Sequence, residues 1–351
     1  MPSSVGIIFN TASHNGLFML PPATLLWLNY NSADILDITE KSLAAVLQLD
    51  YHDLEIIVTD NGSTDGSAKF IENYLAKHKP RGKVKVRFLK VKTNMGWTGG
   101  VNAANSQRRP SSKYLALTHN DVIPRAAYLK TVVDFLERHR DMGAAQGVVV
   151  KLGEESLVDS CGFMMNEGMS VSSVYAGFPV AALRKPMIVT MVEGTMPVYK
   201  LQAITETLCN NSELYINAGY MYYLEDAYVS LKLWANGYKC AVIPDVAASH
   251  HRMGTTAKTV TTGNRFYYLL RNRIALLYMT NSRGKLGFTT QNLRKLVISN
   301  RTQVERKAIM AATLDGIRLG LWLQRKYGCI NFYAAPFTRE TVKARLFKWI
   351  H

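Results

Sequence analysis

The sequence has few cysteines and no long apolar run. Its 351 residues include four cysteines, which lie far apart and form no CxxC pair. This spacing fits a reduced cytoplasmic chain better than a disulfide framework or a cysteine zinc site. The beginning of the chain has no basic and apolar signal segment. No run approaches the roughly 18–20 apolar residues that a membrane-spanning helix needs. We therefore expect a cytoplasmic protein that does not span a membrane.

Two glycine-rich nucleotide-binding motifs are also missing. GxxxxGK[ST] occurs nowhere, which excludes a P-loop. A dinucleotide fold of the Rossmann type needs GxGxxG directly after its first strand, and the turn Asn29-Tyr-Asn-Ser-Ala contains no glycine. The sequence therefore argues against an NAD-dependent dehydrogenase.

Basic residues are in excess. Lysine and arginine number 42 against 26 acidic residues, and the formal net charge is +16. Such a balance favours an anionic partner: a nucleic acid, a phosphorylated ligand or an acidic membrane surface. Hydrophobic residues make up 48% of the chain, which is enough for a large core. The length suggests about two domains, or one large α/β domain with an appendage.

Apolar runs alternate with amphipathic segments along most of the chain. This succession predicts a mostly parallel, doubly wound α/β sheet. Residues 155–215 show less regular periodicity, and the last third is helical, basic and aromatic. We divide the chain into an N-terminal extension (1–22), a catalytic domain (23–255) and a C-terminal helical region (256–351). The expected strands are 24–31, 54–60, 83–88, 147–152, 187–192, 240–244 and one at the start of 114–124; the main expected helices are 35–47, 124–141, 225–236, 266–279 and 304–326.

Polar residues stand at the ends of several expected strands, where open α/β sheets bind their ligands. Asp60 ends the second strand, and Asp121 follows the buried run that begins at Tyr114. Asp121 has a structural alternative, which is to cap the next helix. His250 follows the last strand; together, Asp121, His250 and two diphosphate oxygens would suit Mn²⁺ or Mg²⁺. A lone histidine is more often structural.

Two further segments allow a structural and a functional interpretation. The glycines of 94–102 permit a ligand to approach the backbone closely, or they form a plain turn. Glu225 and Asp226 open a helix, where the helix dipole favours acids. The functional alternative is that one of them is a general base.

Together these segments resemble a family 2 glycosyltransferase, an inverting, nucleotide-sugar-dependent enzyme with the GT-A fold. The similarity covers roughly residues 23–252. It comprises the opening strands (25–32 and 56–67), the glycine- and asparagine-rich loop (94–102), His119-Asn-Asp121 in place of the DxD metal motif, Glu225-Asp226 in place of the ED motif, and the strand-end histidine of 246–250.

The resemblance implies a fold and a set of roles. The fold is a Rossmann-like mixed α/β sheet followed by a helical, basic amphipathic extension. Asp226 is the expected catalytic base, next to Glu225, and Asp121 and His250 are the expected ligands of Mn²⁺ or Mg²⁺. The expected nucleotide-sugar-binding residues are Asn29, Asn31, Asp60, Gly96, Trp97, Gly100, Asn120 and Asp121.

Three features depart from the family pattern. His119 replaces the first aspartate of DxD, and whether His119 or His251 joins the metal site is open. Tyr228 stands where many relatives carry another aspartate, which affects the acceptor pocket. No QxxRW motif is present, which disfavours processive synthesis.

We therefore expect transfer of one sugar from GDP-mannose, or from a UDP or dTDP sugar, to a glycan that is lipid-linked. Basic aromatic segments around Arg265, Arg271 and Arg273, and the tail 339–351, suit peripheral contact with an anionic membrane at its cytosolic face. A helical cap with solvated charges is the alternative for these segments. The alternative functions are a nucleotidyltransferase and a basic nucleic-acid-binding protein; no nucleic-acid-binding module is visible, so we expect no such partner.

Overall fold

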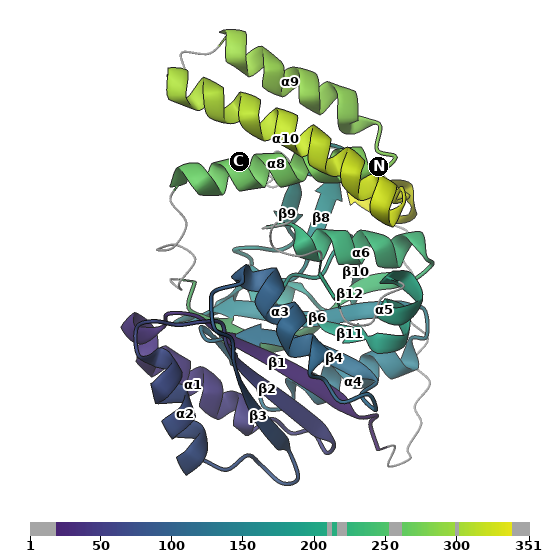
Figure 1. Cartoon of the computed structure of the whole chain (residues 1–351). Helices are drawn as coiled ribbons and strands as arrows, with labels where there is room; N and C mark the ends of the chain where they lie inside the picture. The colour runs from purple at the N-terminus through teal and green to yellow at the C-terminus, as the bar shows by residue number, and fades with distance from the viewer. Residues whose placement is uncertain (1–18, 209–212, 216–222, 253–261, 299–301, 339–351) are drawn as a thin grey trace.

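The structure is a computed structural model that describes residues 19–208, 213–215, 223–252, 262–298 and 302–338. A ten-stranded sheet forms its centre, with the main order β10-β12-β6-β11-β4-β1-β2-β3, and β5 and β7 pair with β12 and β6 (Figure 1). The strands are β1 (Ala23–Asn29), β2 (Leu54–Asp60), β3 (Lys85–Lys90), β4 (Tyr114–His119), β5 (Val122–Pro124), β6 (Met142–Lys151), β7 (Glu154–Ser160), β10 (Met187–Val189), β11 (Val198–Lys200) and β12 (Lys239–His250).

The first half of the sheet is parallel. Strands β4, β1, β2 and β3 lie side by side in one direction, joined by the helices α1 (Leu36–Leu47), α2 (Ser67–Lys77) and α3 (Gly96–Ser106). Successive side chains of β1 enter opposite cores: Leu26 and Leu28 pack on one face, Leu25 and Trp27 on the other. Both faces are therefore covered, and β1 and β2 are buried along their whole length.

The second half of the sheet is mixed. Strand β12 runs parallel to β6, whereas β5, β7, β10 and β11 pair antiparallel with their neighbours. The mixed α/β sheet is confirmed, and the mostly parallel arrangement holds only for the first half. Several of the antiparallel strands have three residues, too few to show a hydrophobic period. A separate sheet contains β8 (Phe163–Asn166), β9 (Val171–Ser173) and β13 (Phe337–Thr338).

Several expected boundaries differ from the structure; β12, for example, spans Lys239–His250 where a strand over 240–244 was expected. Pro124 does not begin a helix; it ends the short strand β5, and the helix α4 spans Tyr128–Arg138. Strand β6 begins at Met142, five residues before the expected start, and includes Gly143. An added Cβ at Gly143 would lie 2.9 Å from both Leu233 Cδ2 and Tyr238 Cβ. Gly143 is thus a close-packing position of the sheet, and local propensity could not reveal this.

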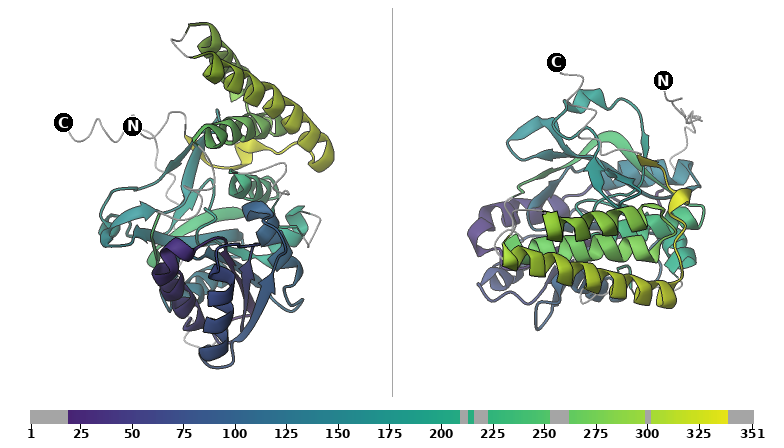
Figure 2. Two further views of the ribbon diagram at one scale, coloured as in Figure 1. Left: turned by 60° about the vertical axis from the view of Figure 1, so that its left-hand side comes forward. Right: turned by 90° about the horizontal axis from the view of Figure 1, so that it is seen from above.

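The remaining helices cover the sheet and one end of the molecule. Helices α5 (Leu201–Leu208) and α6 (Glu225–Ala235) lie beside the second half of the sheet. Seen from above, α8 (Thr262–Met279), α9 (Gly284–Ile298) and α10 (Gln303–Tyr327) form a layer of neighbouring helices (Figure 2). Within the described ranges, no helix is both long and apolar enough to cross a membrane.

Helices α8 and α10 approach each other closely at two glycines. An added Cβ at Gly316 would lie 2.6 Å from the carbonyl oxygen of Arg271, and one at Gly320 would lie 2.5 Å from that of Ala275. Small residues four positions apart thus let the two backbones pack together. The proposed boundary between residues 255 and 256 and the tail 339–351 lie outside the described residues.

Candidate active site

The expected site residues gather at the carboxyl edge of the sheet. The register pairs Asn29 with Asp60 and Leu28 with His119, so β1, β2 and β4 end level with one another. Strand β5 pairs antiparallel with β12 and places Val122 opposite His250. The backbone N–H of His251 also donates a hydrogen bond to the carbonyl of Asp121, at 2.9 Å. These pairings bring the end of β12 against the turn that carries Asp121.

Asn29 and Asp60 form a buried polar network between the first two strands. Asn29 donates from Nδ2 to Asp60 Oδ1 at 2.9 Å, and its Oδ1 accepts from Asn120 Nδ2 at 2.9 Å. Asp60 also accepts from the backbone and hydroxyl of Ser63, at 3.0 and 2.6 Å. Asp60 is only 2% exposed. Its carboxylate therefore shapes the turn after β2.

The glycine-rich loop is fastened to the same turn. Asn61 donates from Nδ2 to the carbonyl of Gly96 at 2.9 Å, and its Oδ1 accepts from the backbone N–H of Met95 at 3.2 Å. An added Cβ at Gly100 would lie 2.8 Å from Leu28 and 3.1 Å from Asn61. Gly100 thus permits close packing of α3 against β1. Asn31 lies nearby, has a positive φ of 43°, and accepts from Thr64 N at 2.8 Å.

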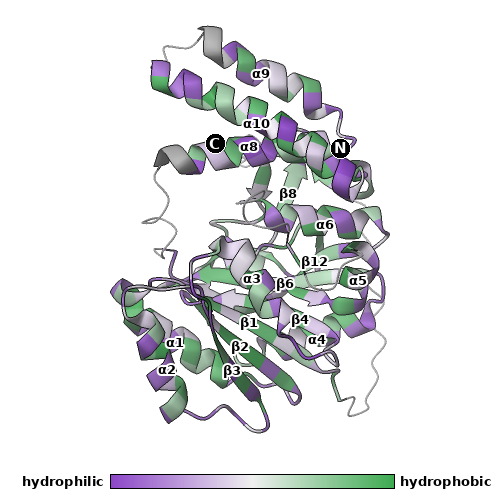
Figure 3. Cartoon of the chain, in the orientation of Figure 1, coloured by the Kyte–Doolittle hydropathy of each residue, from purple (hydrophilic) through white to green (hydrophobic). Residues whose placement is uncertain are grey.

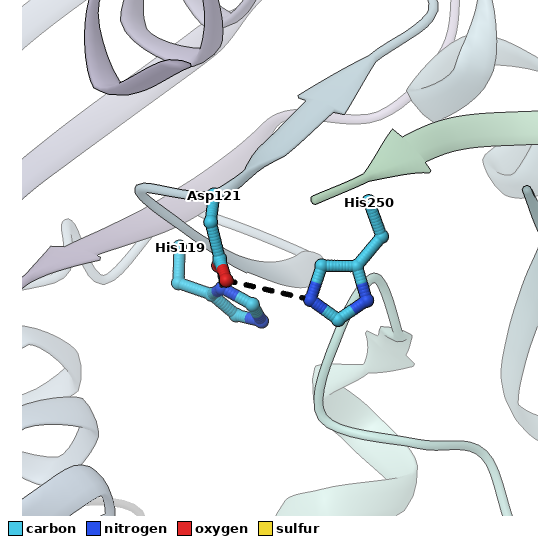
Figure 4. Close-up of side chains that lie close together, drawn as sticks. All are labelled: His119, Asp121 and His250. Carbon is cyan, nitrogen blue, oxygen red and sulfur yellow. Dashed lines mark hydrogen bonds and ion pairs between the residues drawn. The ribbon is translucent and has the colours of Figure 1, made fainter. Parts of the chain in front are cut away.

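Three side chains form a cluster suited to a metal ion (Figure 4). His119, Asp121 and His250 each offer one ligand atom, and these atoms all lie within 4.8 Å of one another. His119 Nδ1 contacts Asp121 Oδ1, and His250 Nε2 lies 3.6 Å from Asp121 Oδ2. Burial would raise the pKa of Asp121, but the two imidazoles hold it well below its usual range. A nitrogen–oxygen–nitrogen donor set of this kind fits a divalent cation.

A second carboxylate orients His250. Asp159, on β7, lies 3.6 Å from His250 Nδ1, and Arg252 Nε binds Asp159 at 2.6 Å. Burial lowers the pKa of His250, but hydrogen bonds to Asp121 and Asp159 outweigh it and raise the value to about 9. A metal-ligating histidine commonly gives its other nitrogen to a carboxylate.

Glu225 and Asp226 begin α6 after two residues with positive φ. Tyr223 and Leu224 both have φ of 68°, an uncommon backbone conformation for such side chains. Asp226 accepts from the backbone N–H of Ala227 at 2.9 Å and of Gly194 at 3.3 Å. Burial raises the pKa of Asp226 to about 6, and burial together with Asp226 raises that of Glu225 to about 8. These are values at which a carboxylate can accept a proton near neutral pH.

Gly194 and Trp97 connect the acidic pair to the metal cluster. An added Cβ at Gly194 would lie 3.6 Å from the Trp97 indole, and the Trp97 ring meets the edge of His119 at a centroid distance of 5.5 Å. The neighbouring Glu193 is buried, which raises its pKa to about 7, and it accepts a hydrogen bond from Ser160. Gly194 and Trp97 thus lie between Asp226 and His119 in the fold.

Sequence reasoning missed three residues of this site. Glu193 and Asp159 fall within 155–215, where the hydrophobic pattern showed little order, and Arg252 belongs to no motif. His119 was one of two histidines whose part in the metal site the sequence left open, and its side chain lies in the cluster. His251, the other open candidate, contributes its backbone, and its side chain is not in the cluster.

The arrangement of the elements is that of the GT-A fold. Staphylococcus aureus TarS (residues 1–349, in complex with UDP-GlcNAc) superposes with a TM-score of 0.54 at 17% identity, over 85% of this chain and 81% of that one. GalNAc-T7, solved with UDP, GalNAc and Mn²⁺, gives a TM-score of 0.55 at 13% identity, over 88% and 58% of the two chains. Identities this low show the fold alone, and the predicted fold is confirmed.

The sequence comparison agrees with the predicted resemblance. Residues 28–169 match the model of glycosyl transferase family 2. A Bacillus subtilis (strain 168) protein named "Putative glycosyltransferase EpsE" is 28% identical over 100 residues, which are 28% of this chain and 34% of that protein. The match thus spans about a third of the relative's length. The sequence similarity to family 2 glycosyltransferases thus covers the first half of the sheet and continues to residue 169.

Proposed function

We propose that the protein transfers one sugar from a nucleotide-diphosphate sugar to a glycan acceptor, with inversion at the anomeric carbon. The main support is that a cluster of the metal-binding type and a half-buried carboxylate pair lie near each other, with Gly194 and Trp97 between them, in a chain whose residues 28–169 match glycosyl transferase family 2. GDP-mannose and UDP or dTDP sugars are the proposed donors, and a lipid-linked saccharide is the proposed acceptor.

Asp121 and His250 are the proposed ligands of Mn²⁺ or Mg²⁺. A bound cation at this position supplies Lewis-acid stabilisation of the charge that develops on the leaving diphosphate. Asp121 contributes a carboxylate kept ionised by its imidazole neighbours, and His250 is oriented by Asp159. The turn around Asn29, Asp60 and Asn120 borders the proposed nucleotide pocket.

Asp226 is the proposed catalytic base. Its carboxylate accepts the proton of the acceptor hydroxyl as the oxygen attacks the anomeric carbon opposite to the leaving group. The backbone N–H groups of Gly194 and Ala227 hold the carboxylate in place. Glu225 Oε2 is buried and has no hydrogen-bond partner among the described residues. We infer that Glu225 contacts the acceptor.

The test begins with a screen of nucleotide sugars for metal-dependent hydrolysis and thermal stabilisation, followed by transfer assays with the best donor. Asp226→Asn should then reduce transfer by about 10²–10⁴-fold, the contribution expected of general-base catalysis. The same variant should still be stabilised by the donor, because ligand binding to the folded state raises stability by mass action.

Asp245→Asn is the matched control, since Asp245 is an exposed aspartate of β12 away from the cluster. It should retain wild-type transfer. Unchanged turnover in Asp226→Asn would remove Asp226 as the base. If no nucleotide sugar stabilises the wild-type protein, the donor class itself is wrong.

We also propose peripheral contact with an anionic membrane, through the outer face of α10. Exposed apolar and basic side chains share this face at intervals of three and four residues and interleave along the helix (Figure 3). Such a mixture suits the headgroup region of an acidic membrane. The face comprises Lys307, Met310, Leu314, Arg318, Leu321, Trp322 and Arg325.

Two of the arginines expected at the membrane are half-buried and make contacts within the protein. Arg271 packs over the Tyr268 ring at 4.9 Å, and Arg273 donates to the carbonyl of Gly168 at 2.6 Å.

A sedimentation assay with lipid vesicles tests the α10 face. Vesicles with phosphatidylserine should bind the wild-type protein, and purely phosphatidylcholine vesicles should not. Replacing Leu314 and Leu321 by aspartate should abolish this binding; unchanged binding would rule out the α10 face.

A further inference from the structure

His119 lies where the family motif has an oxygen ligand, and its imidazole faces the cluster. Its Nδ1 contacts one oxygen of Asp121, while His250 Nε2 lies 3.6 Å from the other oxygen (Figure 4). The two histidine side chains are 21% and 15% exposed, so neither is a freely solvated ring. The carboxylate is thus flanked by two nitrogen donors.

The position of His119 is fixed by the surrounding structure. Its backbone is the last residue of β4 and pairs with Leu28 of β1. Its ring meets Trp97 edge-on at 5.5 Å and His250 at 5.4 Å between centroids. A ligand held by a strand end and by packed aromatic rings loses little further freedom on binding a cation.

We propose that His119 is the third protein ligand of the metal site, and that it makes the site select Mn²⁺ and Co²⁺ over Mg²⁺. The inference rests on the proposed metal-assisted function and specifies its cation. Mg²⁺ is a hard ion that prefers oxygen ligands and dehydrates reluctantly. Imidazole nitrogen favours later transition metals, and affinity at such sites rises from Mn²⁺ to Co²⁺.

The substitution also changes the charge of the site. With neutral imidazoles, His119, Asp121 and His250 together carry one negative charge, whereas an aspartate at position 119 would give two. The second carboxylate would strengthen the attraction for Mg²⁺ in particular, because Mg²⁺ gains little from nitrogen donors. Three protein ligands leave coordination positions for the diphosphate oxygens of a donor.

The experiment measures binding of the metal alone to the full chain, by electron paramagnetic resonance for Mn²⁺ and by competition for Mg²⁺. Wild-type protein should bind Mn²⁺ at least about tenfold more tightly than Mg²⁺. His119→Ala should weaken Mn²⁺ binding by at least about tenfold, since even residues that only orient ligands contribute 10–100-fold. His119→Asp should retain Mn²⁺ binding and bring the Mn²⁺ to Mg²⁺ affinity ratio toward one.

His251→Ala is the matched control, because this adjacent histidine keeps its side chain out of the cluster. It should bind Mn²⁺ like the wild type. The visible spectrum of bound Co²⁺ gives a second readout, and it should change in His119→Ala and stay constant in His251→Ala. Circular dichroism verifies that each variant is folded.

The possible failures are distinguishable. If wild-type protein binds Mn²⁺ and His119→Ala leaves both the affinity and the Co²⁺ spectrum unchanged, His119 is not a ligand and the proposed transfer chemistry still stands. An unaltered Mn²⁺ to Mg²⁺ ratio in His119→Asp overturns the selectivity. If wild-type protein binds neither Mn²⁺ nor Co²⁺, the metal-assisted function fails together with this inference.

Discussion

The acidic pair at the start of α6 predicts how transfer depends on pH. Asp226 acts as a base only when it is ionised, and burial raises its pKa to about 6. Glu225 has a pKa of about 8, because burial and the adjacent Asp226 both disfavour its charge. As pH rises, Asp226 is therefore the first of the two to lose its proton, and transfer should rise with pH through about 6.

The size of the effect follows from the ionised fraction. With a midpoint near 6, about a tenth of Asp226 is ionised at pH 5 and about nine tenths at pH 7. The kcat should therefore fall about tenfold when the pH is lowered from 7 to 5. The assay must contain saturating Mn²⁺ and donor at every pH. The pKa of His250 is raised to about 9, so protons compete with the cation and metal affinity falls as pH falls.

A kcat that stays flat from pH 5 to pH 7 at saturating metal would refute this reasoning.

The pH dependence of stability supplies an independent readout on Glu225. Its pKa rises from 4.5 to about 8 on folding, so the folded state binds more protons between these values. This contribution to stability is present below about pH 4.5 and is lost as pH rises to about 8. Glu225→Gln should flatten that part of the stability profile.

Two further predictions concern how the C-terminal helices support the site. Asn272→Ala should lower the free energy of unfolding by about 1–3 kcal/mol in urea titrations, because Asn272 is fully buried and donates to the Tyr223 carbonyl at 3.1 Å. It should also lower kcat while changing the KM for the donor less, since Tyr223 precedes the acidic pair. A loss of stability with unchanged kcat would limit Asn272 to a structural role. Gly316→Ala should cost about 1–3 kcal/mol through overpacking against α8. Its control, Gly287→Ala, meets open space on α9 and should stabilise by about 0.5–1 kcal/mol, and equal effects of the two would contradict the proposed close packing.

Local sequence determined the first half of the sheet and the order of the motifs. Strands β1 and β2 are apolar runs that end in Asn29 and Asp60, and parallel strands that end level bring such residues together whatever surrounds them. The polar ends of β4 and β12 likewise indicated Asp121 and His250 as candidate ligands. These inferences needed only the pattern of each segment, because a strand buried on both faces is recognisable from its own residues.

Only the tertiary structure decided how these segments combine. Strands of three residues carry no usable period, so the antiparallel pairing of β5 with β12, which sets Asp121 beside His250, was invisible in the sequence. Asp159 reaches His250 through the pairing of β7 with β6, and α8 holds Tyr223 from about fifty residues away in the chain. The structure also separated the two histidines that the sequence left open, because the side chain of His119 lies in the cluster and that of His251 does not. A side chain's role depends on which neighbours the folded sheet brings to it, and those neighbours come from distant segments.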